Sequence, residues 1–302
     1  MYHNPVMLNE SVEALEIIAD GVYVDATFGG GGHSKEILKK ISKNGKLIAI
    51  DQDEEALKNA FVSEKLKLIH GNFRYLKNYI EYLNIGKVNG ILADLGVSSH
   101  HFDTEARGFS YRFSGNLDMR MNQKAEKDAI SIINTYTETD LCNIFWKFGE
   151  LQGARKLAKS IIENRENSKI ETVDELVNIV NAIYPEHRRN KTLSQVFQSL
   201  RIEVNDELKA LEEFLMASID VLADGGILVV ISYHSLEDRM VKRIMKSGNL
   251  QGVVEKDMYG TPITPFKVIS RKVVIPKEEE IRENSRAKAA KLRIAQRIRN
   301  GN

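Results

Sequence analysis

Short apolar runs alternate with amphipathic stretches in the first third of the chain. Four such runs, bounded by Gly, Asn or Asp, predict buried strands at 21–25, 46–51, 66–70 and 88–94. Helical spacing of apolar residues predicts helices between them, near 33–43, 53–62 and 74–83. Strands that alternate with helices are typical of a parallel sheet with helices on both faces, so the pattern predicts an α/β fold.

A fifth strand is predicted at 226–232, about 130 residues after the fourth strand ends near Gly96. Connections between parallel strands seldom exceed a few dozen residues, so this distance predicts an inserted domain. We expect the insertion at 106–205. The sheet domain is then discontinuous and consists of 1–105 and 206–302.

The inserted sequence has helical spacing throughout. One helix is expected to begin after Thr137, and another after Thr172, where Thr172-x-x-Glu175 has the pattern of a capping box and Pro185 ends the helix. An amphipathic stretch at 208–222 leads into the fifth strand, and we assign it to the sheet domain. The insertion is therefore expected to be all-helical.

A local excess of positive charge marks the segment 282–302. It carries seven basic residues and one acidic residue: Arg282, Arg286, Lys288, Lys291, Arg293, Arg297, Arg299 and Glu283. Two interpretations stay open, a solvated helical face and a surface that contacts phosphate groups.

The overall composition excludes several classes of protein. The formal net charge is only +1, from 43 basic and 42 acidic residues, so any attraction for nucleic acid must be local. Cys142 is the single cysteine, which excludes a disulfide framework and multi-cysteine zinc sites. No apolar run approaches the roughly 18 residues that span a bilayer. We expect a soluble, cytoplasmic protein that binds neither membrane nor metal.

A run of four glycines follows the first strand, in Asp25-Ala-Thr-Phe-Gly-Gly-Gly-Gly-His-Ser34. Glycine lets the chain turn sharply and lets a ligand approach the backbone, so the run predicts a nucleotide-binding loop. The pattern GxxxxGK[ST] is absent, because His33 stands where the phosphate-binding lysine would be. An ATP-type P-loop is therefore disfavoured.

Asp51 ends the second strand, where a carboxylate can accept both hydroxyl protons of an adenosine ribose. NAD and S-adenosylmethionine both contain this ribose. Asp25 and Asp94 end strands one and four, and their negative charge suits a sulfonium and an amino group better than a pyrophosphate. Phe73, after the third strand, offers a ring that could stack on adenine. These features favour S-adenosylmethionine.

Two loops are expected to face the glycine loop, since ligands of open α/β sheets bind beyond the carboxyl ends of the strands. One runs from Asp94 to His101, and the other is Ser232-Tyr-His-Ser235. His100, His101 and Asp103 could suggest a metal site, but nothing else at metal-ligand spacing accompanies them. We interpret His101 as a hydrogen-bonding partner of a cofactor. His234 is open to two interpretations, a turn-stabilising role and a catalytic one.

Several separate motifs together resemble one family. They are His3 with Val6-Met-Leu8, Thr27-Phe-Gly-Gly-Gly-Gly-His-Ser34, Ile50-Asp-Gln-Asp53, Asp94-Leu-Gly-Val-Ser-Ser99, Arg107-Gly-Phe-Ser110, Leu117-Asp-Met-Arg-Met121, Phe197-Gln-Ser-Leu-Arg-Ile-Glu-Val-Asn-Asp206, Ser232-Tyr-His-Ser-Leu-Glu-Asp-Arg239 and Asn284-Ser-Arg-Ala-Lys-Ala-Ala-Lys-Leu-Arg293. With these motifs in this order, the chain resembles, over nearly its whole length, the bacterial S-adenosylmethionine-dependent methyltransferases that modify the N4 amine of a cytosine in 16S ribosomal RNA.

The resemblance implies a Rossmann-like class I methyltransferase sheet interrupted by a helical domain that recognises the substrate. It implies cofactor contacts at seven positions: Gly31, Gly32, His33, Asp51, Phe73, Asp94 and His101. Histidine at 101 replaces the glutamine that is more frequent in the family. Tyr233 replaces the usual phenylalanine, and we expect it to lie away from the chemistry.

The implied reaction is methyl transfer from S-adenosylmethionine to the exocyclic N4 amine of a cytosine in the decoding region of 16S ribosomal RNA, within the small ribosomal subunit. We expect Asp94, or a neighbouring carbonyl between Asp94 and Ser99, to accept the amine N–H, and His234 to assist. The insertion, with His187-Arg-Arg-Asn-Lys191, and the basic segment 282–302 would contact phosphates. A homodimer is compatible with the sequence but not fixed by it. The alternatives are an NAD-dependent oxidoreductase and a non-catalytic RNA-binding assembly factor.

Overall fold

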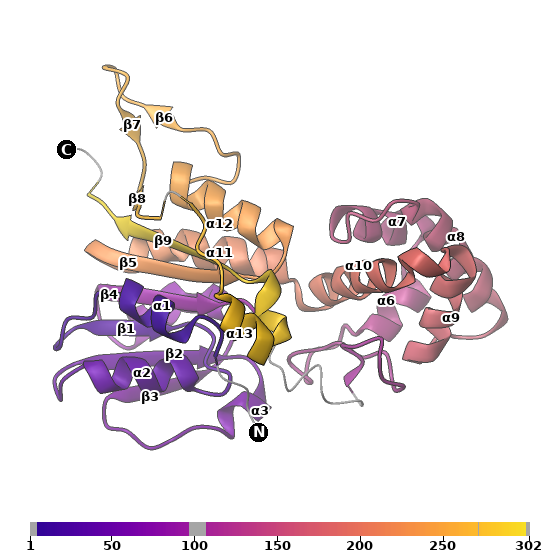
Figure 1. Ribbon diagram of the computed structural model, residues 1–302, viewed down its shortest axis with the longest axis horizontal. Coiled ribbons are helices and arrows are strands. Elements are labelled where there is room, and N and C mark those ends of the chain that lie inside the picture. The colour runs from indigo at the N-terminus through magenta and orange to yellow at the C-terminus, as the bar shows by residue number, and fades with distance from the viewer. Residues whose placement is uncertain (1–4, 97–106, 271, 300–302) are drawn as a thin grey trace. The chain divides into compact units, whose positions relative to one another are not determined.

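The computed structural model describes residues 5–96, 107–270 and 272–299. The chain divides into two compact units, one formed by Met1–Gly96 with Leu208–Asn302 and the other by Val97–Glu207. The first unit contains a seven-stranded sheet with its helices (Figure 1), and the described part of the second is built of helices. The boundary expected at residue 106 lies outside the described residues.

Five parallel strands form most of the sheet. They are β1 (Val22–Asp25), β2 (Lys46–Asp51), β3 (Leu66–His70), β4 (Val88–Asp94) and β5 (Leu222–Ser232). The sheet order is β3-β2-β1-β4-β5-β9-β8, so the chain builds outward from β1 to β3 and then places β4 on the other side of β1. Ligands of such sheets bind where the order reverses, at the carboxyl ends of β1 and β4. The predicted α/β fold is confirmed.

The two faces of the sheet bury different side chains, because successive residues of a strand point to opposite sides. Val24 of β1 belongs to a core that it shares with three helices, α4 (Leu76–Tyr82), α11 (Glu207–Val221) and α12 (Ser235–Ser247). Its neighbour Tyr23 belongs to a second core, shared with α1 (Leu8–Ala14) and α2 (Gly32–Lys40). The carboxyl ends of the central strands are thus held from both faces.

The helix expected near 53–62 is much shorter than predicted. Helix α3 spans only Glu54–Leu57. Beyond it, the side-chain amide of Asn59 donates to the carbonyl of Ala56 at 3.1 Å and to that of Gly29 at 3.4 Å. Phe61 then packs near Phe28, with 6.1 Å between ring centroids. These contacts with the glycine loop stabilise an irregular backbone that the spacing of apolar residues does not reveal.

The described part of the basic segment, 282–299, is not a solvated helical face. After α13 (Glu278–Glu283) and the short 3-10 helix Ser285–Ala289, strand β9 (Lys291–Arg297) pairs antiparallel with β5 inside the sheet. Leu292 and Ala295 of β9 are fully buried. Much of the charge therefore belongs to a strand whose apolar side chains complete the core.

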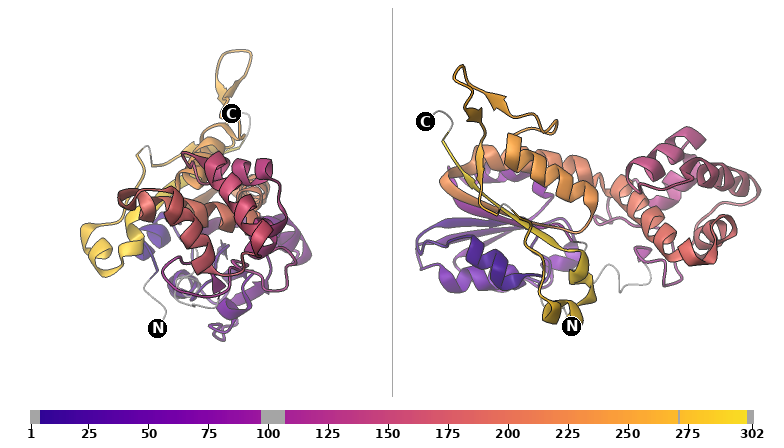
Figure 2. Two further views of the ribbon diagram at one scale, coloured as in Figure 1. Left: turned by 90° about the vertical axis from the view of Figure 1, so that its right-hand side faces the viewer. Right: turned by 45° about the horizontal axis from the view of Figure 1, so that its top comes forward.

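A short antiparallel strand closes the sheet beyond β9. This edge strand is β8 (Phe266–Val268), which pairs with β9. Two shorter strands, β6 (Glu255–Lys256) and β7 (Pro262–Ile263), pair with each other and form a hairpin that extends away from the sheet (Figure 2). β6 and β7 therefore form a second, two-stranded sheet beside the main one.

In the described part of the second unit, 107–207, five helices pack around one apolar core: α6 (Ala129–Thr135), α7 (Glu138–Lys147), α8 (Ala154–Asn167), α9 (Val173–Ile183) and α10 (Glu186–Asn205). Thr137 and Thr172 each form a capping box, at the start of α7 and α9, as their sequence patterns predict. Helix α9 ends before Pro185, as predicted. None of the helices described for this chain is long and apolar enough to cross a membrane.

Candidate functional site

The glycine run forms the turn between β1 and α2. Gly31 caps α2 with a φ of 74°, a left-handed conformation that favours glycine. A Cβ at Gly31 would lie 2.9 Å from Cζ of Phe28, and one at Gly32 would lie 2.0 Å from Cγ of Pro5. The two glycines predicted to contact a cofactor are thus also required by the packing of the turn itself.

Asp51, the last residue of β2, stabilises this turn. Its Oδ2 accepts a hydrogen bond from the backbone N–H of Gly29 at 2.8 Å, and its Oδ1 accepts one from that of Asp53 at 2.9 Å. The side chain is partly exposed. The geometry suits the additional role predicted for Asp51, acceptance of the two hydroxyl protons of a ribose.

Asp25, the last residue of β1, lies completely buried beneath the turn. Its Oδ2 accepts from the hydroxyl of Ser34 at 2.6 Å, and its Oδ1 accepts from the N–H of Thr27 at 3.2 Å. Burial raises the pKa of this carboxyl to about 6, although the nearby His33 and the two hydrogen bonds oppose the rise. With no exposed surface, Asp25 supports the loop instead of contacting a cationic ligand directly, which corrects the interpretation drawn from the sequence.

Asp94, the last residue of β4, places a partly exposed carboxylate where the strand order reverses between β1 and β4. Its N–H donates to Oγ1 of Thr27 at 2.7 Å, which joins the end of β4 to the glycine turn. Its Oδ1 accepts from the N–H of Gly96 at 3.3 Å. Burial raises the pKa of Asp94 above its ordinary value, and the nearby His33 acts against the rise. A cation close to this carboxylate would therefore be stabilised.

His33 lies between these acidic groups, in the first turn of α2. Its ring is buried, and Nε2 is 3.2 Å from the carbonyl oxygen of Val6. A carbonyl only accepts hydrogen bonds, so Nε2 carries the proton and donates it. The imidazole attracts the carboxylates of both Asp25 and Asp94. The structure thus brings His33 and Asp94 together, as the sequence predicts for residues of one site.

Phe73 follows β3 at the start of the 3-10 helix Phe73–Tyr75. Its ring makes an edge-on contact with that of Phe214 in α11, with 5.2 Å between centroids. The side chain is nevertheless only partly buried. Part of the ring therefore serves the core, and its stacking on adenine stays a prediction.

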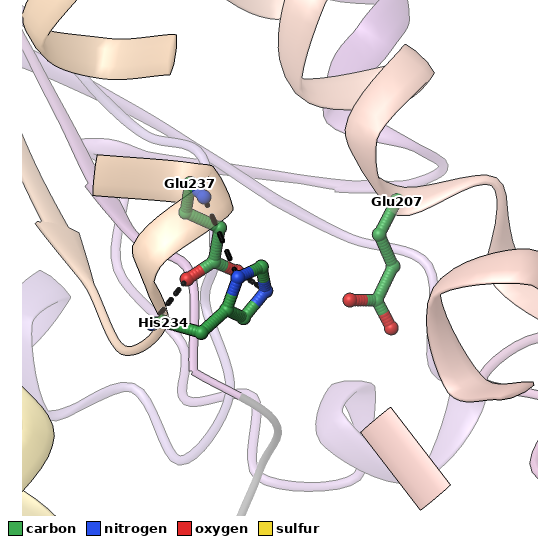
Figure 3. Close-up of side chains that lie close together, drawn as sticks. All are labelled: Glu207, His234 and Glu237. Atoms are coloured by element: carbon green, nitrogen blue, oxygen red, sulfur yellow. Dashed lines mark hydrogen bonds and ion pairs between the residues drawn. The ribbon is translucent and has the colours of Figure 1, made fainter. Parts of the chain in front are cut away.

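His234 is the N-cap of α12 and is separated from the end of β5 by a single residue, Tyr233 (Figure 3). Its Nδ1 accepts from the N–H of Glu237 at 3.4 Å, and Oε2 of Glu237 accepts in return from the N–H of His234 at 3.3 Å. Its Nε2 lies 3.1 Å from Oε1 of the same glutamate. This reciprocal arrangement is a capping box, so the geometry favours the turn-stabilising interpretation of His234.

Tyr233 is the residue of the site that the sequence interpretation missed. Its hydroxyl lies close enough to the carboxylate of Asp94 to lower the pKa of that carboxyl, so the expectation that Tyr233 lies away from this group is wrong. The pairing of β4 with β5, which sets Asp94 opposite Ile231, is the signal that would have placed Tyr233 near Asp94. His101, the remaining predicted cofactor contact, lies outside the described residues.

The described side chains fit an adenosyl ligand that carries a positive charge. Asp51 suits a ribose, and Asp94 places a partly exposed carboxylate, whose pKa burial raises, beside the same turn. The sheet order, with its reversal between β1 and β4, places both groups around the glycine turn. Together, fold and site define a Rossmann-like class I methyltransferase, which uses S-adenosylmethionine.

Comparison with known proteins gives the family. The chain belongs to the MraW methylase family, whose model matches residues 1–298. It is 52% identical over 296 residues to the ribosomal RNA small subunit methyltransferase H of Bacteroides fragilis strain YCH46, covering 98% of this chain and 97% of that protein. The protein of the same name from Flavobacterium johnsoniae is 52% identical over 297 residues, 98% of each chain.

A solved rRNA methylase from Streptococcus thermophilus aligns with 99% of both chains at 12% identity and a TM-score of 0.44. This score is low, so the fold is assigned from the strand order in the sheet of this chain.

Proposed function

We propose that this protein transfers a methyl group from S-adenosylmethionine to the N4 amine of a cytosine in 16S ribosomal RNA of the small subunit, in the cytoplasm. Full-length similarity to small-subunit rRNA methyltransferases supports the class of substrate. One structural observation carries the chemistry: Asp94 lies where the strand order reverses, with its side chain partly exposed and its backbone N–H bound to Oγ1 of Thr27 in the glycine turn.

The chain would hold the cofactor through the groups around the turn. Asp51 accepts hydrogen bonds from the ribose, and Phe73 stacks on adenine with the part of its ring that the core leaves accessible. Gly31, Gly32 and His33 shape the turn against which the ligand lies. S-adenosylmethionine supplies an electrophilic methyl group on a positively charged sulfur.

The cytosine amine needs assistance because its lone pair is delocalised into the ring. Asp94 accepts a hydrogen bond from the amine, which orients the nitrogen toward the methyl group and stabilises the positive charge that grows on it. Because burial raises the pKa of Asp94, its carboxylate is a better proton acceptor than an ordinary aspartate once it is ionised. His234 assists indirectly, by fixing the start of α12 after the Tyr233 turn.

Phosphate contacts would come from the helical unit. His187, Arg188 and Lys191 are exposed at the start of α10. Structured RNA is bound largely through its backbone and its unpaired bases, and the target base must leave its stack at a cost of a few kcal/mol. Replacing Arg188 and Lys191 by Ala should weaken RNA binding and reduce its dependence on salt, while Lys43→Ala, at an exposed position of the sheet unit, should not.

The decisive experiment uses the full chain, radiolabelled S-adenosylmethionine and small subunits from cells that lack this modification. We expect label in 16S RNA, and N4-methylcytidine after nuclease digestion and mass spectrometry. Asp94→Asn should lose most of the transfer, whereas Asp20→Asn, which changes an exposed carboxyl, should retain it. Binding of subunits without any transfer of label would favour a non-catalytic assembly factor and refute the proposal.

A further inference from the structure

Tyr233 lies against the two residues that end β4 and begin the following loop. Its hydroxyl lies near the side chain of Asp94, whose pKa it lowers. Its ring covers Gly96 so closely that a Cβ there would lie 2.7 Å from Cε2 and 3.3 Å from the hydroxyl oxygen. The tyrosine therefore contacts both the acidic side chain and the backbone that continues from it.

The backbone fixes the position of this ring from two directions. The N–H of Tyr233 donates to Oε2 of Glu237 at 2.8 Å, which ties it to the first turn of α12. On the other side, the N–H of Leu95 donates to the carbonyl of Ile231 at 2.9 Å, so the ends of β4 and β5 stay in register. Asp94 ends β4 and Tyr233 directly follows β5, so the carboxylate and the hydroxyl are carried by the ends of two paired strands.

Several groups around Asp94, including Tyr233, influence whether its carboxyl is ionised. Burial raises the pKa of Asp94, and Glu237 of α12 raises it further. His33 of α2 and the hydroxyl of Tyr233 lower it. Burial also raises the pKa of Tyr233 well above its ordinary value, with further contributions from Asp94, Glu237 and Glu280. The phenol therefore stays protonated and remains a donor over the whole pH range of an enzyme assay.

We propose that the hydroxyl of Tyr233 is a positioning group, which orients the carboxylate of Asp94 and keeps it ionised so that it can accept the hydrogen bond of the target amine. The inference rests on the proposed function, in which Asp94 contacts that amine. The N–H of Gly96 already donates to this carboxylate, and a hydrogen bond from the phenol beside it would give it a defined orientation before the substrate arrives.

The test is Tyr233→Phe, which removes one oxygen and keeps the ring over Gly96. We expect kcat to fall roughly tenfold at neutral pH, as befits a lost hydrogen bond to a charged group. The KM for small subunits and the Kd for S-adenosylmethionine should stay within about twofold, because neither ligand loses a contact. The acid limb of the pH profile should move to higher pH, since the carboxyl of Asp94 loses a group that favours its ionised form.

Tyr82→Phe is the matched control, because it removes a hydroxyl from a tyrosine that is 84% exposed on α4. It should leave kcat and the pH profile unchanged. An unaltered pH profile in Tyr233→Phe would overturn the inference, even if kcat fell, because a purely structural role would not move the profile.

A double-mutant cycle separates this inference from the proposed function. In an Asp94→Asn background, the additional change Tyr233→Phe should cost little, because the carboxylate through which the tyrosine acts is gone. Full additivity of the two losses would overturn the role of Tyr233 and leave the proposed function intact. Full activity of Asp94→Asn alone would instead refute the proposed role of Asp94.

Discussion

The carboxylate of Asp51 and the backbone N–H of Gly29 form a hydrogen bond of 2.8 Å between the end of β2 and the glycine turn. The side chain therefore shapes the loop, and it is also the group proposed to bind the ribose. Loss of Asp51 would remove both functions at once. This coupling explains why a single acidic residue can have a large effect on the affinity for the cofactor.

Asp51→Ala should raise the Kd for S-adenosylmethionine by about 100-fold, because charge-assisted hydrogen bonds are each worth about 1.5–3 kcal/mol. Isothermal titration calorimetry measures this directly. Glu64→Ala, at an exposed position before β3, should bind like the original chain. Unchanged affinity of Asp51→Ala would refute the assignment of the ribose to this residue.

Asp25→Asn should alter the pH dependence of stability. The folded pKa of about 6 exceeds the ordinary value of 3.8, so the folded chain binds a proton that the unfolded chain releases between these values. The stability contributed by this proton is present below pH 4 and is lost as the pH rises through 6. The difference amounts to about 3 kcal/mol for a shift of roughly two units.

Urea unfolding of the ligand-free protein at pH 4 and pH 7.5 checks this expectation. Asp25→Asn has no titrating carboxyl here, so it does not lose the stability that the original chain loses between pH 4 and pH 7.5. Relative to the original chain, its free energy of unfolding should therefore rise by about 3 kcal/mol over this interval. Asp20→Asn serves as the control at an exposed position. Equal pH dependence of Asp25→Asn and the original chain would contradict the raised pKa.

Arg293→Ala should destabilise the sheet unit. Nε of Arg293 donates to Oδ1 of Asp238 at 2.6 Å, and each side chain is only 14% exposed. Burial works against ionisation of Asp238, yet Arg293 and Lys291 hold its pKa below the ordinary value. Loss of the arginine leaves this carboxylate poorly paired, and we expect a cost of about 2 kcal/mol in the free energy of unfolding.

Arg299→Ala is the matched variant, since Arg299 is exposed beyond the end of β9. Its midpoint of urea unfolding should remain close to that of the original chain. If Arg293→Ala unfolded at the same urea concentration but bound RNA more weakly, the guanidinium would be a phosphate contact and not a structural ion pair.

His234→Asn should retain both folding and methyl transfer. Asparagine is a favourable N-cap and can replace the Nδ1 of His234 as acceptor for the N–H of Glu237. His234→Ala removes the cap and should cost about 1 kcal/mol of stability. A loss of transfer above about 100-fold in a stable His234→Asn protein would show that the imidazole takes part in the chemistry, since this corresponds to nearly 3 kcal/mol in the barrier.

The periodic parts of the fold could be predicted from the sequence because each carries a local signal. Buried parallel strands such as 46–51 are nearly continuous apolar runs, and Thr172 with Glu175 gives both halves of a capping box. The delay before β5 indicated an insertion, since a crossover does not require so many residues. These signals depend on neighbours in the sequence.

The missed features depend on contacts between distant residues. Strand β9 is basic, and its burial depends on β5 and β8, which precede it in the chain. The end of α3 depends on Asn59 and Phe61 reaching the glycine turn. Tyr233 could be placed near Asp94 only once β4 and β5 were known to pair in parallel register.

The position of β9 sets the order in which the sheet can be completed during synthesis. Ser232 of β5 is paired with Lys291, which lies 59 residues further along the chain. Until those residues emerge from the ribosome, one edge of β5 remains open, with its backbone N–H and C=O groups unsatisfied by a strand. An exposed edge invites association with other chains, so folding of the nascent protein must keep this edge shielded until the late strand arrives.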